Sequence, residues 1–182
     1  MKIGVIGAGS WGTALANVVA TNGHATVLWA YEPELVAGMA ATGINHLFLP
    51  GIELHPALQY TGSLAEAVNG ADLVLLVTPT QVMRGLLAAL GTELSPTTVL
   101  ASASKGIELG TLCTVSRICC QVLGDNVAER FVALSGPTFA REVAQGLPSL
   151  IVAGSGNNAA ACLVQRLFSN PSFRVYTSSD TI

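Results

Sequence analysis

The feature that most constrains this chain is a glycine motif close to its amino terminus. Residues 7–12, Gly-Ala-Gly-Ser-Trp-Gly, fit the pattern G-x-G-x-x-G directly after an apolar run at Lys2–Ile6 and just before a helix-like stretch. In that context Gly7 permits a tight turn, Gly9 lets the backbone approach a pyrophosphate, and Gly12 allows the helix to pack closely on the strand. An ordinary glycine-rich turn is the alternative, because glycine is common here at 19 residues.

The helix that follows the motif offers its amino terminus to an anion. Its first N–H groups have no partner within the helix, and the helix dipole adds about half a positive charge there. A diphosphate can therefore bind without a lysine, which predicts a dinucleotide site for NAD or NADP. Ser10 and Trp11 lie at the apex of the loop. We expect Ser10 to donate to a phosphate, whereas packing and cofactor contact explain Trp11 equally well.

The end of the second expected strand bears on the choice between NAD and NADP. An acidic residue about twenty positions beyond the motif usually binds the ribose 2′-hydroxyl. Glu32 lies at that distance, and no arginine lies near this strand end to receive a 2′-phosphate. Tyr31 is suited either to stacking on adenine or to covering the sheet edge. Charge alone favours NAD.

Apolar runs of strand length alternate with helix-length segments along the chain. We expect strands at Lys2–Ile6, Thr26–Ala30, Leu58–Tyr60, Asp72–Val77, Val99–Ala103, Phe131–Leu134, Leu150–Ala153 and Arg174–Tyr176. We expect helices at Trp11–Thr21, Thr111–Leu123, Phe139–Gln145 and Asn158–Phe168, and shorter ones that open at Pro33, Ser63 and Pro79. The alternation predicts an α/β, Rossmann-type doubly wound, mostly parallel sheet, with its ligand crevice at the carboxyl ends of the strands. No linker or repeat divides the chain, so we expect residues 1–182 to form one dinucleotide-binding domain.

The composition is unusually apolar, with 51% hydrophobic and 10% charged residues, against about 25% charged in ordinary soluble domains. A membrane protein and a soluble domain with a large covered surface both fit these fractions. The uncharged stretch from Ile3 to Tyr31 is interrupted by glycines, asparagines and a histidine, which suit neither a membrane helix nor a secretory signal. We therefore expect a soluble domain with an apolar surface that a partner or further domain covers.

Charge and cysteine usage exclude further classes. The formal net charge is −3 and no lysine or arginine cluster occurs, which disfavours nucleic acid as a partner. The four cysteines are Cys113, Cys119, Cys120 and Cys162, and they show no C-x-x-C spacing and no paired histidines, so we expect no metal site. Adjacent Cys119 and Cys120 lie in an apolar helical stretch and are interpreted as reduced core thiols, which fits a reducing cytoplasm.

Two later segments follow expected strands and point to an anionic substrate. Lys105, within Ser102–Gly106, should lie at the same sheet edge as the glycine motif and could bind a phosphate or carboxylate; a solvated surface lysine is the alternative. In Ser135–Glu142, Pro137 suits the first turn of a helix, and Thr138 offers a hydroxyl beside free backbone donors.

Several segments together carry a family resemblance. They occur in the order Gly7–Ala16 (GAGSWGTALA), Phe48–Pro50 (FLP), Ser104–Glu108 (SKGIE), Ser135–Glu142 (SGPTFARE) and Phe173–Tyr176 (FRVY). In this order and spacing the chain closely resembles the amino-terminal domain of bacterial NAD(P)-dependent glycerol-3-phosphate dehydrogenases, over all 182 residues.

The resemblance implies reversible hydride transfer between NAD(P)H and dihydroxyacetone phosphate, which gives sn-glycerol 3-phosphate for phospholipid synthesis. By position it implies cofactor contacts at Ser10, Trp11, Tyr31 and Ala140, and substrate contacts at Gly136 and Thr138. Lys105 matches a residue that touches both cofactor and substrate. Family members often carry a basic residue where this chain has Tyr31, so a strong preference for NADP is not expected.

The family also implies a helical second domain that carries a lysine acting as general acid and base. This sequence ends at Ile182, before that lysine, so we expect a fragment with no catalytic residue of its own that binds dinucleotide but turns over negligibly. The three histidines, His24, His46 and His55, are better interpreted as core or surface residues. We also expect the chain to self-associate through the apolar surface that the second domain would otherwise cover. A homodimer remains one possible assembly.

Two other interpretations share the first motif. One is a different two-domain dehydrogenase, of the ketopantoate reductase or 3-hydroxyacid type. The other is a non-catalytic NAD-sensing module whose nucleotide binding drives association with a partner. Ser104–Glu108 and Ser135–Glu142 argue against both, because they suit substrate chemistry and match the glycerol-3-phosphate family.

Overall fold

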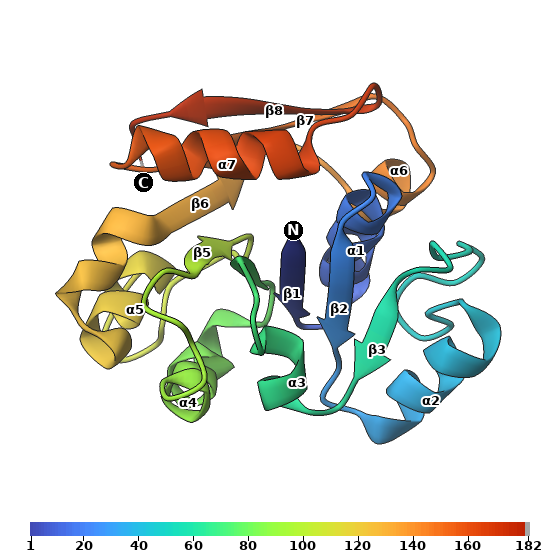
Figure 1. Ribbon diagram of the computed structural model, residues 1–182, viewed down its shortest axis with the longest axis horizontal. Helices are drawn as coiled ribbons and strands as arrows, with labels where there is room; N and C mark the ends of the chain where they lie inside the picture. The colour runs from blue at the N-terminus through green and yellow to red at the C-terminus, as the bar shows by residue number, and fades with distance from the viewer. Residues whose placement is uncertain (181–182) are drawn as a thin grey trace.

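The computed structural model describes residues 1–180 as one eight-stranded sheet flanked by helices (Figure 1). The strands are β1 Lys2–Ile6, β2 Ala25–Trp29, β3 Gln59–Thr61, β4 Leu73–Leu76, β5 Val99–Ser102, β6 Phe131–Ser135, β7 Ser149–Gly154 and β8 Phe173–Ser178. The helices are α1 Ser10–Thr21, α2 Pro33–Thr42, α3 Leu64–Val68, α4 Thr80–Leu90, α5 Val115–Leu123, α6 Ala140–Ala144 and α7 Asn158–Phe168, with a 3₁₀ helix, η1, at Asp125–Arg130.

The strand order is β3-β2-β1-β4-β5-β6-β7-β8, and neighbouring strands from β3 to β6 run parallel. The chain therefore winds outward in one direction from β1 to β3 and in the other from β4 to β6. This arrangement confirms the predicted doubly wound α/β fold. It also puts the switch between the two directions at β1 and β4, where ligands of such sheets bind beyond the carboxyl ends of the strands.

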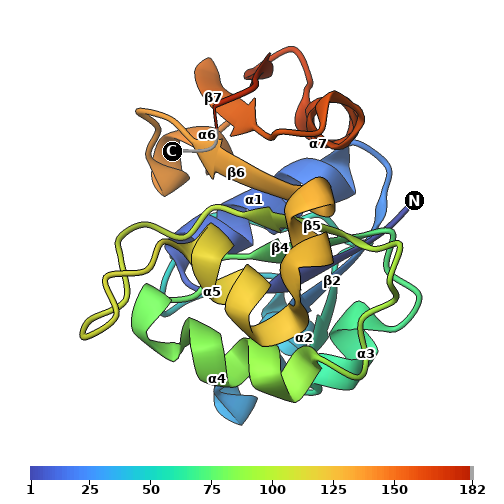
Figure 2. The ribbon, with the colours of Figure 1, turned by 90° about the vertical axis from the view of Figure 1, so that its left-hand side faces the viewer.

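Two apolar cores lie on the two faces of the sheet, and β4 contributes to both. Leu73 and Leu75 join the core under α1 and α7, whereas Val74 and Leu76 join the core under α3, α4 and α5. This alternation follows from the period of two in a strand, and all four side chains are fully buried. Figure 2 shows α4 and α5 together on one side of the sheet, with α1 on the other.

Helix starts follow local capping signals in part. Ser63 caps α3 by accepting a hydrogen bond from the N–H of Glu66, as the capping-box pattern predicts. The helix expected at Thr111–Leu123 is present as α5, but the prediction of its first residue was wrong, because the helix begins at Val115. The segment before Val115 is instead a turn in which Leu112 has a φ of 56° and its N–H donates to the carbonyl of Glu108.

The last part of the sheet departs most from a uniform parallel arrangement. β7 runs antiparallel to β6, and β8 runs parallel to β7 at the sheet edge. Helix α7 covers one face of this pair, where Ile151 and Val175 are buried. On the opposite face Leu150 and Tyr176 remain 46% and 55% exposed. Among the helices described for residues 1–180, none combines the length and apolar character needed to cross a bilayer.

Candidate functional site

The glycine motif forms the turn between β1 and α1, and two of its glycines are required sterically. Gly7 has a φ of 117°, and its N–H donates to the carbonyl of Trp29 at 3.1 Å. A Cβ at Gly12 would lie 1.9 Å from the carbonyl oxygen of Gly7, so no side chain fits there. The roles predicted for Gly7 as a turn residue and Gly12 as a packing residue are both confirmed.

Gly9 has a different role, because it faces open space. It is the N-cap residue of α1, it supplies no side-chain cap, and a Cβ built on it meets no atom within 4 Å. The N–H groups of the first turn of α1 thus face outward beside a backbone with no side chain to block an approaching anion. Ser10 follows Gly9 and is exposed, whereas Trp11 is half-buried and packs against the core. Packing therefore accounts for at least part of the role of Trp11.

The buried side chain of Asn45, which the sequence patterns did not single out, stabilises this loop by hydrogen bonds. Asn45 is fully buried, and its Nδ2 donates to the carbonyl of Ala8 and to Oγ1 of Thr13, both at 2.9 Å. Its Oδ1 accepts from the N–H of Phe48 at 2.9 Å. The connection after α2 is therefore tied to the glycine loop. The one available signal was the position of Asn45 just before Phe48–Pro50.

The end of β2 places Tyr31 and Glu32 beside the glycine loop, since β1 and β2 are paired in parallel. Tyr31 is 80% exposed, and its ring meets that of Trp29 edge-on at 6.3 Å between centroids. Glu32 is the half-buried N-cap residue of α2 and lines a cavity of about 200 Å³ together with His46. An exposed aromatic face and a carboxylate thus lie where the adenosine half of a dinucleotide would extend.

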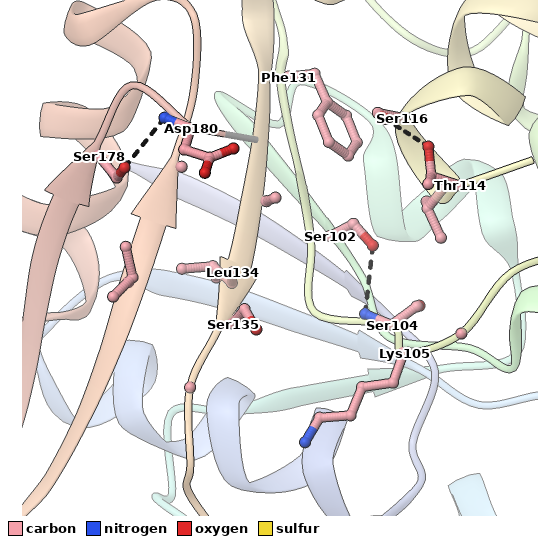
Figure 3. A pocket seen from close by; sticks show the side chains of 16 residues that line it. Ser102, Ser104, Lys105, Thr114, Ser116, Phe131, Leu134, Ser135, Ser178 and Asp180 are labelled. Carbon is pink, nitrogen blue, oxygen red and sulfur yellow. Dashed lines mark hydrogen bonds between the residues drawn. The ribbon is translucent and has the colours of Figure 1, made fainter. Parts of the chain in front are cut away.

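A larger cavity, of about 690 Å³, opens at the carboxyl ends of β5 and β6. Ser102, Ser104 and Lys105 line it from the β5 side, and Ser135 and Gly136 line it from the end of β6. Figure 3 shows Ser178 and Asp180 on the opposite wall, at the end of β8. The structure therefore brings together Lys105 and Gly136, which lie in separate sequence segments.

Thr138 and Ala140 lie just beyond Gly136. The Oγ1 of Thr138 is buried without a hydrogen-bond partner among the described residues. Ala140 is the first residue of α6, which packs against α1. Pro137 lies before this helix and not in its first turn, which corrects the prediction. Gly136 packs closely on β7, since a Cβ there would lie 2.9 Å from the carbonyl oxygen of Leu150. The chain then bends at Pro137 and is extended at Phe139, so the helix begins only at Ala140.

The smaller cavity includes His46 beside Glu32, whereas the cysteines and the other two histidines line neither cavity. All four cysteines are free, and burial raises the pKa of the Cys119 thiol to about 12, so it remains an inert core group. His24 is half-buried at the turn between α1 and β2, where desolvation and then the positive amino terminus lower its pKa. These positions agree with their interpretation as structural residues.

Comparison with known proteins decides the family. Residues 2–161 match the family model described as NAD-dependent glycerol-3-phosphate dehydrogenase N-terminus. The chain belongs to this glycerol-3-phosphate dehydrogenase family. A glycerol-3-phosphate dehydrogenase [NAD(P)+] of Trichlorobacter lovleyi is 81% identical over all 182 residues, and one of Geobacter sulfurreducens is 59% identical over 181 residues. The chain spans 55% and 54% of the lengths of these two dehydrogenases.

Solved structures agree with this assignment. The crystal structure of a glycerol-3-phosphate dehydrogenase from Coxiella burnetii superposes with a TM-score of 0.91 at 30% identity, over 98% of this chain and 54% of that one. A ketopantoate reductase from Ralstonia eutropha superposes with a TM-score of 0.72 at 20% identity, over 99% of this chain and 57% of that one. The second likeness is one of fold alone, so it gives the ketopantoate alternative no support beyond the shared sheet.

Proposed function

We propose that this domain binds NAD or NADP for a glycerol-3-phosphate dehydrogenase, which reversibly transfers hydride between NAD(P)H and dihydroxyacetone phosphate. Its product, sn-glycerol 3-phosphate, would enter glycerophospholipid synthesis. The observation that carries the proposal is the open space at Gly9, the N-cap residue of α1, where a Cβ would meet no atom within 4 Å. A diphosphate fits this place because it needs N–H donors and close approach to the main chain.

The cofactor residues we propose surround this turn. Gly7, Gly9 and Gly12 shape the loop, and Ser10 and Trp11 contact the phosphates. Tyr31 and Glu32 hold the adenosine half, Glu32 through the ribose 2′-hydroxyl. Lys105 and Ala140 approach the nicotinamide half from the β5 and β6 sides. The proximity of α6 to α1 and of β2 to β1 supports this distribution.

The substrate residues we propose are Lys105, Gly136 and Thr138. Lys105 is the one cation among the described residues that line the larger cavity, so it suits the phosphate or the carbonyl oxygen of the substrate. The buried Oγ1 of Thr138 has no hydrogen-bond partner among residues 1–180, and such a group is stabilised when a ligand supplies one. Several serine hydroxyls in the wall can bond a small polyol phosphate.

Nicotinamide, when bound, would supply or accept the hydride. Residues of the protein would then have to stabilise and protonate the negative charge that develops on the substrate oxygen. We assign Lys105 to positioning and propose that the general acid and base is a lysine outside these 182 residues. No histidine lines the cavity, and its one described carboxylate comes from Asp180. The proposal therefore includes strong cofactor binding and negligible turnover by this chain alone.

Titration of the chain with NADH and NADPH, followed by the quenching of tryptophan fluorescence, tests the proposal. We expect saturable binding of at least one dinucleotide, competed by its oxidised form. A folded chain that binds neither would overturn it. Dihydroxyacetone phosphate is then added with NADH, and oxidation at a rate near that of a full-length dehydrogenase would refute the assignment of the catalytic lysine elsewhere.

We propose in addition that the chain functions in the cytoplasm and self-associates when isolated, with a homodimer as the simplest assembly. Free cysteines suit a reducing compartment, and all four are unpaired. The uncovered face of β7 and β8, with exposed Leu150 and Tyr176, supports association.

A further inference from the structure

Helix α4 makes several hydrogen bonds to the segment that carries Lys105. The hydroxyl of Thr80 donates to the carbonyl of Lys105 at 2.9 Å. The side chain of Gln81 bonds the same segment twice, because its Nε2 donates to the carbonyl of Ile107 and its Oε1 accepts from the N–H of Leu109, each at 2.9 Å. Two consecutive residues of α4 therefore bond to three alternate residues of the segment after β5, namely Lys105, Ile107 and Leu109.

An ion pair between Arg84 of α4 and Glu108 adds to these contacts. Arg84 donates from Nε and Nη2 to the two carboxylate oxygens of Glu108, at 2.9 and 2.6 Å. This two-point contact fixes both the distance and the plane of the carboxylate. Thr111 donates to the same carboxylate at 2.5 Å, and Gln121 of α5 accepts from Arg84 at 2.7 Å. The Arg84 guanidinium, followed by the Thr111 hydroxyl, lowers the pKa of Glu108, so the carboxylate is charged at neutral pH.

The segment has little else to hold it. It forms no regular helix or strand between Ser102 and Val115, and Ile107, Leu109 and Leu112 are 47%, 76% and 70% exposed. Ala103 and Cys113 anchor the two ends of the segment in the core, at 2% and 7% exposed, but apolar burial does not fix the backbone between them. Glu108 is the one buried residue at 104–112, at 8% exposed, and it bonds back to Arg84 of α4. Besides the bond from the Ser104 hydroxyl to the carbonyl of Thr78 at 2.7 Å, it is the polar contacts with α4 that tie residues 104–112 to the rest of the domain.

We infer that Arg84, assisted by Gln81, is a positioning residue for Lys105, and the inference rests on the proposed function of Lys105. A lysine side chain has four rotatable bonds, so its ammonium group reaches a defined point only if its backbone is fixed. Arg84 fixes that backbone through Glu108 while its own guanidinium touches neither the cavity wall nor the glycine loop. The family resemblance singled out Ser104–Glu108 but nothing on α4.

A double-mutant cycle separates positioning from a general effect on stability. NADH dissociation constants are measured for wild type, Lys105→Ala, Arg84→Ala and the double variant. We expect each single variant to weaken NADH binding about fivefold, and the double variant to be no weaker than Lys105→Ala alone. Arg84→Lys should restore binding in part, since an ammonium keeps the charge but loses the two-point geometry. Additive losses, or unchanged binding by Arg84→Ala, would overturn the inference.

Arg117→Ala is the matched control, because Arg117 is exposed on the neighbouring helix α5 and lies outside the cavity that contains Lys105. It should leave NADH binding unchanged. A wild-type chain that binds no NADH would refute the proposed function instead, so a second measurement is independent of the cofactor. Hydrogen exchange of the amides at residues 105–112 should accelerate at least about tenfold in Arg84→Ala, with β5 unchanged. Equal protection in the variant would overturn the positioning role regardless of NADH.

Discussion

The side-chain amide of Asn45 donates to the main-chain carbonyl of Ala8 across 2.9 Å. Both residues are buried, and the same amide also donates to Oγ1 of Thr13. The carbonyl of Ala8 is thereby turned into the protein, so that the loop presents N–H groups and not carbonyl oxygens to an anion. A residue from the connection after α2 thus controls the electrostatic character of the β1–α1 turn.

Replacing Asn45 with alanine should weaken both the fold and cofactor binding. Loss of the amide leaves the carbonyl of Ala8 with only the longer bond from the Thr13 hydroxyl, at 3.2 Å, and removes the acceptor of the Phe48 N–H. Such a loss costs about 1–3 kcal/mol of unfolding free energy in urea titrations. Affinity for NADH should fall more than affinity for adenosine, since the disturbed part faces the diphosphate. The exposed Asn126 provides the control Asn126→Ala, for which we expect neither effect. An equal loss for NADH and adenosine would contradict the role in the diphosphate loop.

Substitutions at two glycines of the motif should affect the stability of the fold and the binding of NADH differently. Gly12→Ala places a Cβ 1.9 Å from the Gly7 carbonyl oxygen, and since backbone must move we expect a loss at the upper end of the ~1–3 kcal/mol range for overpacking. Gly9→Ala puts its methyl group in open space, so stability should change by less than about 1 kcal/mol. Its NADH affinity should nevertheless fall at least about tenfold, because the methyl group occupies the approach of the pyrophosphate.

Thermal unfolding and NADH titration of both variants check this separation. Gly85→Ala, inside α4 with open space at its Cβ, is the control and should be slightly stabilised without any change in binding. Unaltered NADH affinity in Gly9→Ala would mean that the diphosphate does not lie against this residue.

The sequence was most informative where a residue type has one steric solution. The positive φ of Gly7 and the contact distance at Gly12 leave no alternative to glycine, so the motif and its place after an apolar run predicted the turn and the helix. The nearly all-aliphatic Asp72–Val77 likewise indicated a buried strand, and Leu73–Leu76 within it are fully buried.

Strand direction and long-range polar contacts were beyond the sequence patterns. An apolar run such as Leu150–Ala153 shows the same pattern in a parallel and in an antiparallel strand. Its antiparallel direction follows from α6, which packs on α1 and does not lead the chain back across the sheet to start a parallel strand. Asn45 and Arg84 gave no periodic signal either. Each makes its contacts with a segment distant in the chain, which only the assembled fold brings near.

Cofactor choice should respond to the charge of Glu32. The 2′-phosphate of NADP carries up to about two negative charges, and each costs about 1 kcal/mol near a carboxylate at 4 Å in water. Glu32→Gln should therefore raise the affinity for NADPH relative to NADH by about tenfold or more. Separate fluorescence titrations with the two dinucleotides measure this ratio. Glu34→Gln, two residues further along in the first turn of α2, is the comparison, and a larger change there would show that Glu32 is not the residue at the ribose.

The Arg84–Glu108 pair should make stability depend on pH. The pKa of Glu108 is lowered in the folded chain from its ordinary value of 4.5. Its contribution is therefore complete above that value and is lost as the pH falls through the folded pKa. Glu108→Gln should unfold at lower urea than wild type at pH 7, and the difference should shrink below about pH 4. The exposed Glu93→Gln should show no such trend. A difference that persists undiminished at pH 3 would mean that the charge of Glu108 is not what stabilises the turn.

The uncovered face of β7 and β8 should govern self-association. Side chains on the α7 face are buried, with Ile151 at 1% and Val175 at 2%, whereas Leu150 and Tyr176 on the opposite face are about half exposed. Since β8 is also an edge strand, its free backbone groups can pair with another chain.

Sedimentation velocity over a concentration series tests this face. We expect wild type to shift to larger species as concentration rises, and the double variant Leu150→Glu/Tyr176→Lys to remain monomeric, because charge on an apolar contact face must be desolvated on association. Val82 is 53% exposed on α4, so Val82→Lys adds a charge elsewhere and should associate like wild type. If wild type sediments as a monomer throughout, the exposed face does not drive association. If Val82→Lys also abolishes association, the contact lies on the α4 side of the sheet.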